Sequence, residues 1–299
     1  MDIIRPGTQI DFMKYRKAAF TLSAALIIIS IAALFVRGLN YGTDFTGGTE
    51  IQVAFSKVVK TDEVRSAIEP IGLAGASIQS IGENRDNEFL IRTPVEGDTG
   101  GETVQQIEGA LKDTFGEENV DIRRVDVVGA AVSKDLKQKG FLSLFYAGIG
   151  LLIYIWWRFK ISYSVAAIIA LAHDVIITVG IFSLTGREIS LPVIAALLTV
   201  IGYSLNDTII VFDRIRENIK KAAGSFDYSS LLDSSISQTL SRTLITSSTT
   251  LFVVLALFLF GGSVINNFAF AIMVGLIVGT YSSIFIASPI LLFFRQEKE

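Results

Sequence analysis

Residues 191–218 read LPVIAALLTVIGYSLNDTIIVFDRIREN, an apolar run that meets an Asn-Asp pair, turns apolar again and ends in charged residues. A membrane helix needs about 20 mostly apolar residues, and this stretch supplies them. Asp207 lies six residues before Asp213, which we take as the membrane boundary. At about 1.5 Å per residue the carboxylate is then roughly 9 Å inside the membrane. A charge at that depth is costly, so Asp207 predicts a functional site, with a static salt bridge to Arg242 as the alternative.

The composition is that of a membrane protein. The 299 residues are 51% apolar and only 18% charged, against about 25% charged in soluble domains, and the mean hydropathy is +0.53. The net charge of −3 does not favour nucleic acid as a partner. The chain has no cysteine and one histidine, His173. This excludes disulfides, cysteine-ligated metal and multi-histidine metal sites, and we expect no metal or cofactor.

Six apolar segments are predicted to be membrane helices: 18–36, 141–157, 161–184, 190–212, 243–260 and 267–294. The first is expected to be a retained helix, because no small-residue cleavage site followed by polar chain comes after it. The predicted domain plan is a cytoplasmic segment 1–17, the first helix 18–36, an outer domain 37–139, helices two to six within 140–294, and a tail 295–299.

The basic residues between and beside the predicted helices indicate which way the protein crosses the membrane. On one side of the membrane, the short connections and the two terminal segments carry twelve basic residues: Arg5, Lys14, Arg16, Lys17, Arg158, Lys160, Arg214, Arg216, Lys220, Lys221, Arg295 and Lys298. Those on the other side carry only Arg187. Because Lys and Arg favour the cytoplasmic side, both termini are expected in the cytoplasm. Residues 37–139 would then lie in the periplasm of a plasma (inner) membrane protein.

The polar interval 38–139 predicts a small α+β domain. Alternation indicates strands at 47–56 and 120–129 and a hairpin from 76–83 and 87–94 around the turn residues ENRD. Helical spacing indicates helices at 61–72, with Thr61 as N-cap, and at 102–116, with Val104, Ile107 and Leu111 on one face. The resulting order β-α-β-β-α-β is the ferredoxin-like pattern.

Further polar residues interrupt the apolar segments. His173 and Asp174 fall in the middle of the third helix, and Arg242 opens the fifth, followed by hydroxyl residues from Thr246 to Thr250. Arg242, Thr246 and Thr249 share one helical face, which predicts a polar seam between helices. Simpler interpretations stay open: the hydroxyls could bond to their own backbone, and His173 and Asp174 could serve packing alone.

A glycine-rich stretch, LNYGTDFTGGTEIQV at 39–53, follows the first helix. Gly47 and Gly48 allow backbone angles that other residues avoid, so an ordinary turn into the first strand explains them. The alternative is a hinge that lets the outer domain tilt, with Asp44 beside it and Phe45 as its anchor.

Together these motifs resemble the SecF family, accessory subunits of the bacterial protein-export translocase in the resistance–nodulation–division (RND) superfamily. GYSLNDTIIVFDRIREN, LNYGTDFTGG, LAHDVIIT and SRTLITSSTT with a following FGG are similar to the family's motifs, and the likeness spans the chain. The related SecD subunits share the DF-x-GG motif but carry a much larger first outer domain.

The resemblance implies a twelve-helix unit formed with SecD, which uses the proton-motive force for late steps of polypeptide translocation. The implied partners are SecD, the SecYEG channel, SecA, the unfolded secretory polypeptide, and, as further candidates, YajC and YidC. It implies functional roles for Asp207 and Arg242, which form our predicted proton relay together with Asp174, His173 and Thr246.

Two other functions stay open: half of an RND-type small-molecule exporter, and a scaffold of the translocase that moves no protons. An enzyme is disfavoured, because nothing in the sequence places a nucleophile beside a base.

Overall fold

The computed structural model describes residues 8–73, 75–81, 87–94, 100–222 and 226–296. The chain forms two compact units. The helical unit comprises Met1–Asn40 and Ser143–Glu299, and the sheet unit comprises Tyr41–Leu142.

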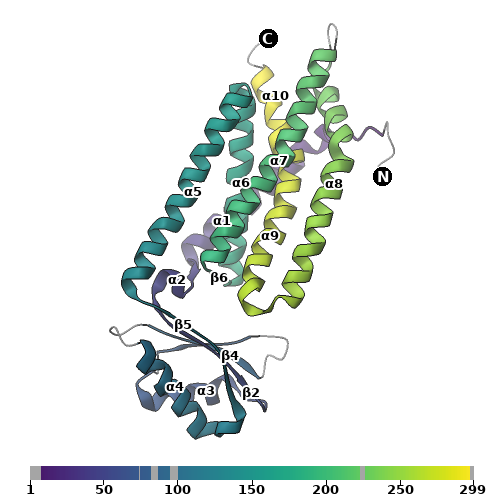
Figure 1. Cartoon of the computed structure of the whole chain (residues 1–299). Helices are drawn as coiled ribbons and strands as arrows, with labels where there is room; N and C mark the ends of the chain where they lie inside the picture. The colour runs from purple at the N-terminus through teal and green to yellow at the C-terminus, as the bar shows by residue number, and fades with distance from the viewer. Residues whose placement is uncertain (1–7, 74, 82–86, 95–99, 223–225, 297–299) are drawn as a thin grey trace. The chain divides into compact units, whose positions relative to one another are not determined.

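The helical unit is a bundle of long helices (Figure 1). Its elements are a 3₁₀ turn Met13–Tyr15, α1 Arg16–Val36, the later part of α5 Ala130–Arg158, α6 Ile161–Thr185, the short strand β6 Glu188–Ile189, α7 Leu191–Lys221, α8 Tyr228–Phe260, α9 Gly262–Ser282, a π-helical turn Ser283–Ala287, and α10 Ser288–Gln296. Among the described residues, six helical spans are long and apolar enough to cross a membrane, the last of them Ile265–Phe294. The prediction of six membrane helices is confirmed.

Two helices begin earlier than the apolar segments suggested. α5 starts at Ala130 instead of 141, and α8 starts at Tyr228 instead of 243. The added residues mix charged and hydroxyl side chains with apolar ones, so their mean hydropathy is too low to mark a membrane span, although they sustain a helix. Asp227 caps α8, because its carboxylate accepts hydrogen bonds from the backbone N–H groups of Ser229 and Ser230. The expectation that Arg242 opens its helix was therefore wrong.

Small residues bring the central helices close together. A Cβ atom at Gly180 of α6 would lie 2.7 Å from the Cα of Ser30 in α1, and one at Gly279 of α9 would lie 2.9 Å from the Cβ of Ser204 in α7. Such close backbone approach is typical of helix packing in membranes. It brings the hydroxyl groups of α1, α7 and α9 within reach of polar side chains in the bundle interior.

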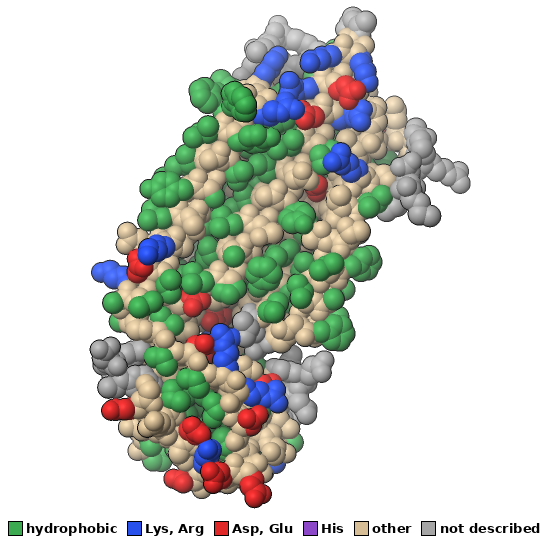
Figure 2. Space-filling model, in the orientation of Figure 1, with side chains coloured by type: hydrophobic (Ala, Val, Ile, Leu, Met, Phe, Trp, Pro, Cys, Tyr) green, Lys and Arg blue, Asp and Glu red, His purple; other side chains and the backbone are tan. Residues whose placement is uncertain are grey.

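The surface of the helical unit suits a membrane environment. Figure 2 shows hydrophobic side chains over much of its visible face and Lys and Arg gathered at one end. The exposed hydrophobic residues include Trp157, Phe252 and Val253. Figure 1 shows the start of α1 and the end of α10 at the same end of this unit.

The boundary between the two units falls within the two-residue strand β1 Asn40–Tyr41. The sheet unit contains a one-turn helix α2 Thr43–Thr46, β2 Gly48–Phe55, α3 Thr61–Ile68, a 3₁₀ turn Glu69–Ile71, β3 Ser77–Ser80, β4 Glu88–Thr93, α4 Gly100–Phe115, a 3₁₀ turn Glu117–Asn119, β5 Val120–Val128, and the first residues of α5. Its four strands lie in the order β3-β4-β2-β5, and each neighbouring pair is antiparallel. In register, Ile51 faces Ile91 of β4 and Val125 of β5.

The element order β-α-β-β-α-β agrees with the sequence prediction. Ile107 and Leu111 of α4 are fully buried against the strands, and Val104 is partly buried. Thr61 was wrong as the N-cap, because it is the first helical residue and Lys60 occupies the cap position. The predicted ENRD turn lies outside the described residues, and the ferredoxin-like assignment stays a prediction.

Candidate functional site

Asp207 lies on the buried face of α7, one helical turn after Ser204. Its carboxylate Oδ2 accepts a hydrogen bond from Ser247 of α8 at 3.3 Å. The Ser247 hydroxyl also shares a 2.9 Å hydrogen bond with the Thr280 hydroxyl of α9. A short chain of hydroxyl groups therefore connects the carboxylate of α7 to α8 and α9.

Arg242 and Thr246 of α8 do not take part in this chain of hydroxyl groups. Both are exposed in the isolated chain, and within the described residues neither forms a hydrogen bond or an ion pair with Asp207. The Thr246 hydroxyl donates to the carbonyl groups of Arg242 and Thr243, each at 3.0 Å, and Thr249 also bonds to its own helix. The simpler interpretation of these hydroxyls therefore fits, and Ser247 carries the contact to Asp207 instead.

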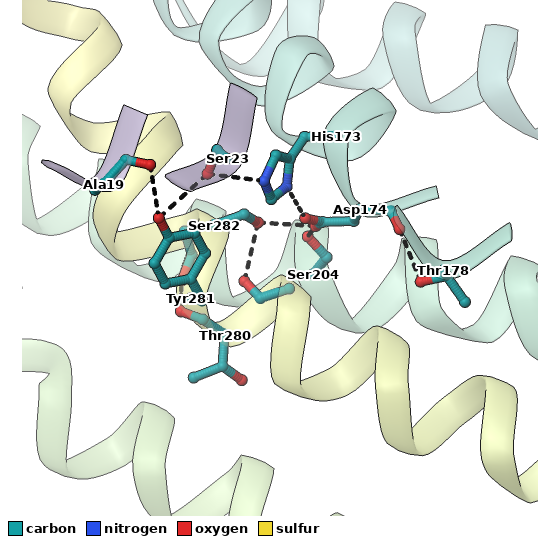
Figure 3. Close-up of polar contacts among 11 residues, drawn as sticks. Ala19, Ser23, His173, Asp174, Thr178, Ser204, Thr280, Tyr281 and Ser282 are labelled. Carbon is teal, nitrogen blue, oxygen red and sulfur yellow. Dashed lines mark hydrogen bonds and ion pairs between the residues drawn. The ribbon is translucent and has the colours of Figure 1, made fainter. Parts of the chain in front are cut away.

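His173 and Asp174 of α6 form a second buried polar group (Figure 3). The ring nitrogen Nδ1 of His173 lies 2.8 Å from Oδ1 of Asp174. The other carboxylate oxygen, Oδ2, accepts hydrogen bonds from Ser204 of α7 at 2.5 Å and from Ser282 of α9 at 2.8 Å. Asp174 thus joins three helices, with both of its oxygens satisfied.

The cluster continues from His173 toward α1. Its Nε2 lies 3.1 Å from the hydroxyl of Ser23 in α1. Ser23 lies 3.2 Å from the hydroxyl of Tyr281, which donates to the carbonyl of Ala19 at 2.9 Å. Figure 3 shows Tyr281 and Ser282 on the same stretch of α9, with Ser23 and Ala19 on α1. We call His173, Asp174, Ser204, Ser282, Ser23 and Tyr281 the His–Asp cluster.

The residues at the charged end of α7 form ion pairs with residues of α5 and of α7 itself. Asp213, taken as the membrane boundary, accepts two 2.9 Å hydrogen bonds from Arg158, at the end of α5. Arg214 donates to Glu217. Successive residues point about 100° apart on a helix, so Asp213 and Arg214 face different neighbours.

The candidate hinge residues lie in the sheet unit. Asp44 and Phe45 belong to α2, where Phe45 is buried and contacts the ring of Tyr41 edge-to-face at 6.0 Å. Gly47 and Gly48 follow with φ of +71° and +134°. A Cβ atom at Gly48 would lie 2.5 Å from the carbonyl oxygen of Thr93. Glycine is therefore required at position 48 by the local packing.

Sequence reasoning missed Ser23, Ser204, Thr280, Tyr281 and Ser282 as members of these two groups. Isolated hydroxyl residues are common in membrane helices and usually bond to their own backbone, so composition does not mark them. The available signal was position: Ser204 precedes Asp207 by one helical turn, and four consecutive hydroxyl residues, Thr280 to Ser283, interrupt the last apolar segment.

Two family descriptions match the chain. "Protein export membrane protein SecD/SecF, C-terminal" covers residues 106–297, and "SecD/SecF GG Motif" covers residues 32–57. A protein translocase subunit SecF of Desulfurispirillum indicum is 47% identical over 96% of this chain and 92% of its own length. The chain belongs to the SecF family.

Two further SecF proteins and two SecDF structures are similar to nearly the whole chain. The SecF proteins of Vibrio alginolyticus and Escherichia coli O157:H7 are 46% and 42% identical, over 99% and 97% of this chain and 93% and 89% of theirs. The crystal structure of SecDF from Thermus thermophilus, described as a translocon-associated membrane protein, matches 97% of this chain with 37% identity and a TM-score of 0.86. SecDF in a super-membrane-facing form matches with 36% identity over the whole chain and a TM-score of 0.71. The chain spans 39% and 40% of the length of these two SecDF chains.

Proposed function

We propose that this chain is a subunit of the Sec protein-export machinery that acts with SecD to couple the proton-motive force to late steps of polypeptide translocation. The observation that carries the proposal is a buried carboxylate, Asp207, held in a hydroxyl chain inside a membrane bundle of the SecF family. An ionisable group inside a membrane bundle is by default a candidate for proton or ion handling. Asp207 would bind and release the proton.

An exposed polar face of α7 and α8 supports a membrane partner. Arg242, Thr246 and Thr249 of α8 and Asn206 of α7 are exposed in the isolated chain. An arginine facing lipid is costly, so a second bundle that covers this face would remove the cost. SecD, whose helices share the same plan, is the proposed partner, and Arg242 would then act on Asp207 from a covered position.

The remaining partners and the orientation are part of the same proposal. SecYEG and SecA would supply the channel and the ATP-driven steps, with YajC and YidC as further candidates. Both termini would lie in the cytoplasm, and residues 37–139 in the periplasm would contact the unfolded polypeptide. Gly47 and Gly48, with Asp44 and Phe45, would form the region about which the sheet unit changes its tilt.

The test is export into inverted inner-membrane vesicles that lack SecD and SecF. Adding this chain together with SecD should restore the fraction of export that an uncoupler abolishes. Restored export without any uncoupler-sensitive fraction would favour a scaffold. Energy-dependent accumulation of a small amphiphile in place of any effect on export would favour the exporter.

A further inference from the structure

The turn Thr280–Tyr281–Ser282 of α9 touches both buried acidic groups. Thr280 shares a hydrogen bond with Ser247, which donates to Asp207. Ser282 donates to Asp174, and Tyr281 contacts Ser23 of the His–Asp cluster. Successive residues of a helix point about 100° apart, so one turn of α9 can face α1, α6 and α8 together.

Counting hydroxyl hydrogens assigns the protonation of the His–Asp cluster. Tyr281 has one hydrogen and donates it to the Ala19 carbonyl, so Ser23 must donate to Tyr281. Having spent its only hydrogen, Ser23 must accept from Nε2–H of His173. Nε2 is therefore protonated.

The same count places one proton between His173 and Asp174. Two lone pairs facing each other across 2.8 Å would repel, so the pair holds a proton on either Nδ1 or Oδ1. In both cases the buried pair is neutral overall, as an imidazolium with a carboxylate or as an imidazole with a carboxylic acid. Removing that proton would leave an uncompensated buried negative charge, which is unfavourable.

The surroundings of the pair contain few ionisable groups. The facing polar side chains are Ser23 of α1, Ser204 of α7, and Tyr281 and Ser282 of α9. Within the described part of the chain, no Lys, Arg or Glu side chain hydrogen-bonds to the pair. The pair thus depends on the hydroxyl groups that α7 and α9 present to it, and these helices also position Asp207 and its partners.

The protonation of Asp207 sets the direction of the bonds that reach α9. When Asp207 is a carboxylate, Ser247 donates its hydrogen to Oδ2, and Thr280 must donate to Ser247. When Asp207 is protonated, it can donate to Ser247, and Ser247 can then donate to Thr280. The Thr280 hydroxyl therefore changes role when Asp207 gains or loses a proton.

A π-helical turn, Ser283–Ala287, follows directly after Ser282. The Ser288 hydroxyl donates to the Ser283 carbonyl at 2.8 Å and so contributes a side-chain bond to the widened turn. Single π-helical turns inside α-helices frequently occur at functional sites. Here the turn is placed where α9 can adjust between two bonding patterns of Thr280.

We infer that the Thr280–Ser282 turn of α9, with Ser204 of α7, links two proton-binding sites, Asp207 and the His173–Asp174 pair, so that the proton affinity of each depends on the state of the other. Such linkage is reciprocal by thermodynamic necessity. Thr280 is a positioning residue in this scheme, and His173 and Asp174 hold the second proton.

The single histidine of the chain makes a direct test possible. The full chain, labelled with ¹⁵N-histidine and reconstituted with SecD in lipid nanodiscs, gives one imidazole signal pair by NMR when SecD is unlabelled. We expect Nε2 to be protonated and the midpoint of the His173 titration to differ between wild type and Asp207→Asn by about 1 pH unit, the size that marks strongly coupled sites. An unprotonated Nε2, or equal midpoints in the two proteins, would overturn the inference.

Three threonine variants test the route through α9. Thr280→Val should remove most of the difference in midpoint between chains with and without the Asp207→Asn change, and Thr280→Ser, which keeps the hydroxyl, should retain it. Thr250→Val is the matched control, because in the described part of the chain the Thr250 hydroxyl bonds only to the Thr246 carbonyl of its own helix. A difference that survives Thr280→Val would contradict the α9 route.

The inference rests on the proposed function, but the two can fail separately. Coupled titration in a chain whose export does not depend on Asp207 would refute the proposed function alone. Export that depends on Asp207, together with a His173 titration midpoint that is the same in wild type and Asp207→Asn, would refute the linkage alone.

Discussion

Replacing Gly48 by alanine tests whether the glycine pair is required by the static fold of the sheet unit. The backbone at Gly48 has φ of +134°, and a Cβ atom there would lie 2.5 Å from the Thr93 carbonyl oxygen. A non-glycine residue in such a conformation costs about 1–3 kcal/mol, and overpacking costs about 1–3 kcal/mol more. The expected destabilisation is therefore about 2–6 kcal/mol, a large part of the roughly 5–15 kcal/mol that a domain has.

Hydrogen exchange on the full-length protein in nanodiscs measures this loss. Amides of β2 and of its partners β4 and β5 should exchange at least about 30-fold faster in Gly48→Ala, since each 1.4 kcal/mol is a factor of ten. Gly109→Ala in α4 is the control, because a Cβ there meets no atom within 4 Å. That substitution should slow exchange slightly through better helix propensity. Unchanged protection in Gly48→Ala would refute the packing argument and leave a hinge as the remaining reason for the glycine.

Two further predictions concern topology and helix capping. A cysteine introduced at Ser56 should react with an impermeant thiol reagent added outside sealed cells, while one at Lys220 should not; the reverse pattern would overturn the proposed orientation. Asp227→Ala should weaken the start of α8 by about 1 kcal/mol, seen as faster amide exchange at Ser230, whereas Asp227→Asn, which keeps a capping oxygen, should not. Hydrogen bonds from the Ser230 side chain and backbone hold the pKa of Asp227 below its usual value, so the extra stabilisation that the charged carboxylate gives is present at neutral pH and is lost as the pH falls through that lowered pKa. A protection factor at Ser230, corrected for the intrinsic exchange rate, that falls with pH equally in wild type and Asp227→Asn would contradict this charge-dependent part.

Hydropathy and alternation were sufficient for the coarse architecture because they follow directly from burial. Six apolar segments gave six helices, and the spacing of Ile107 and Leu111 placed them in the core of the sheet unit. The starts of α5 and α8 were missed, because their charged and hydroxyl residues keep the mean hydropathy below that of a membrane span. The N-cap of α3 was misplaced by one residue, at Thr61 instead of Lys60, since cap positions depend on backbone angles and not on residue type alone.

The candidate site could be predicted only where an ionisable residue lies in an apolar segment. Asp207, His173 and Asp174 are costly in such segments, so they can be recognised from the sequence. Their partners are serine and threonine residues from helices far apart in the chain, such as Ser23 beside His173. Which hydroxyl meets which carboxylate depends on helix packing, and Ser247 could not be distinguished from Thr246 by sequence spacing. Only the fold shows that Ser247 faces inward.

The central claim is that Asp207 binds a proton during export, and Asp207→Asn tests it most directly. The amide keeps the shape of the side chain and its ability to accept a hydrogen bond from Ser247, but it does not titrate. Export into inverted vesicles should therefore keep its ATP-driven part and lose the uncoupler-sensitive part, while the variant still assembles with SecD. Arg242→Met should give the same loss. If Asp207→Asn retains the full uncoupler-sensitive fraction, Asp207 is a packing residue and the chain does not use it to move protons.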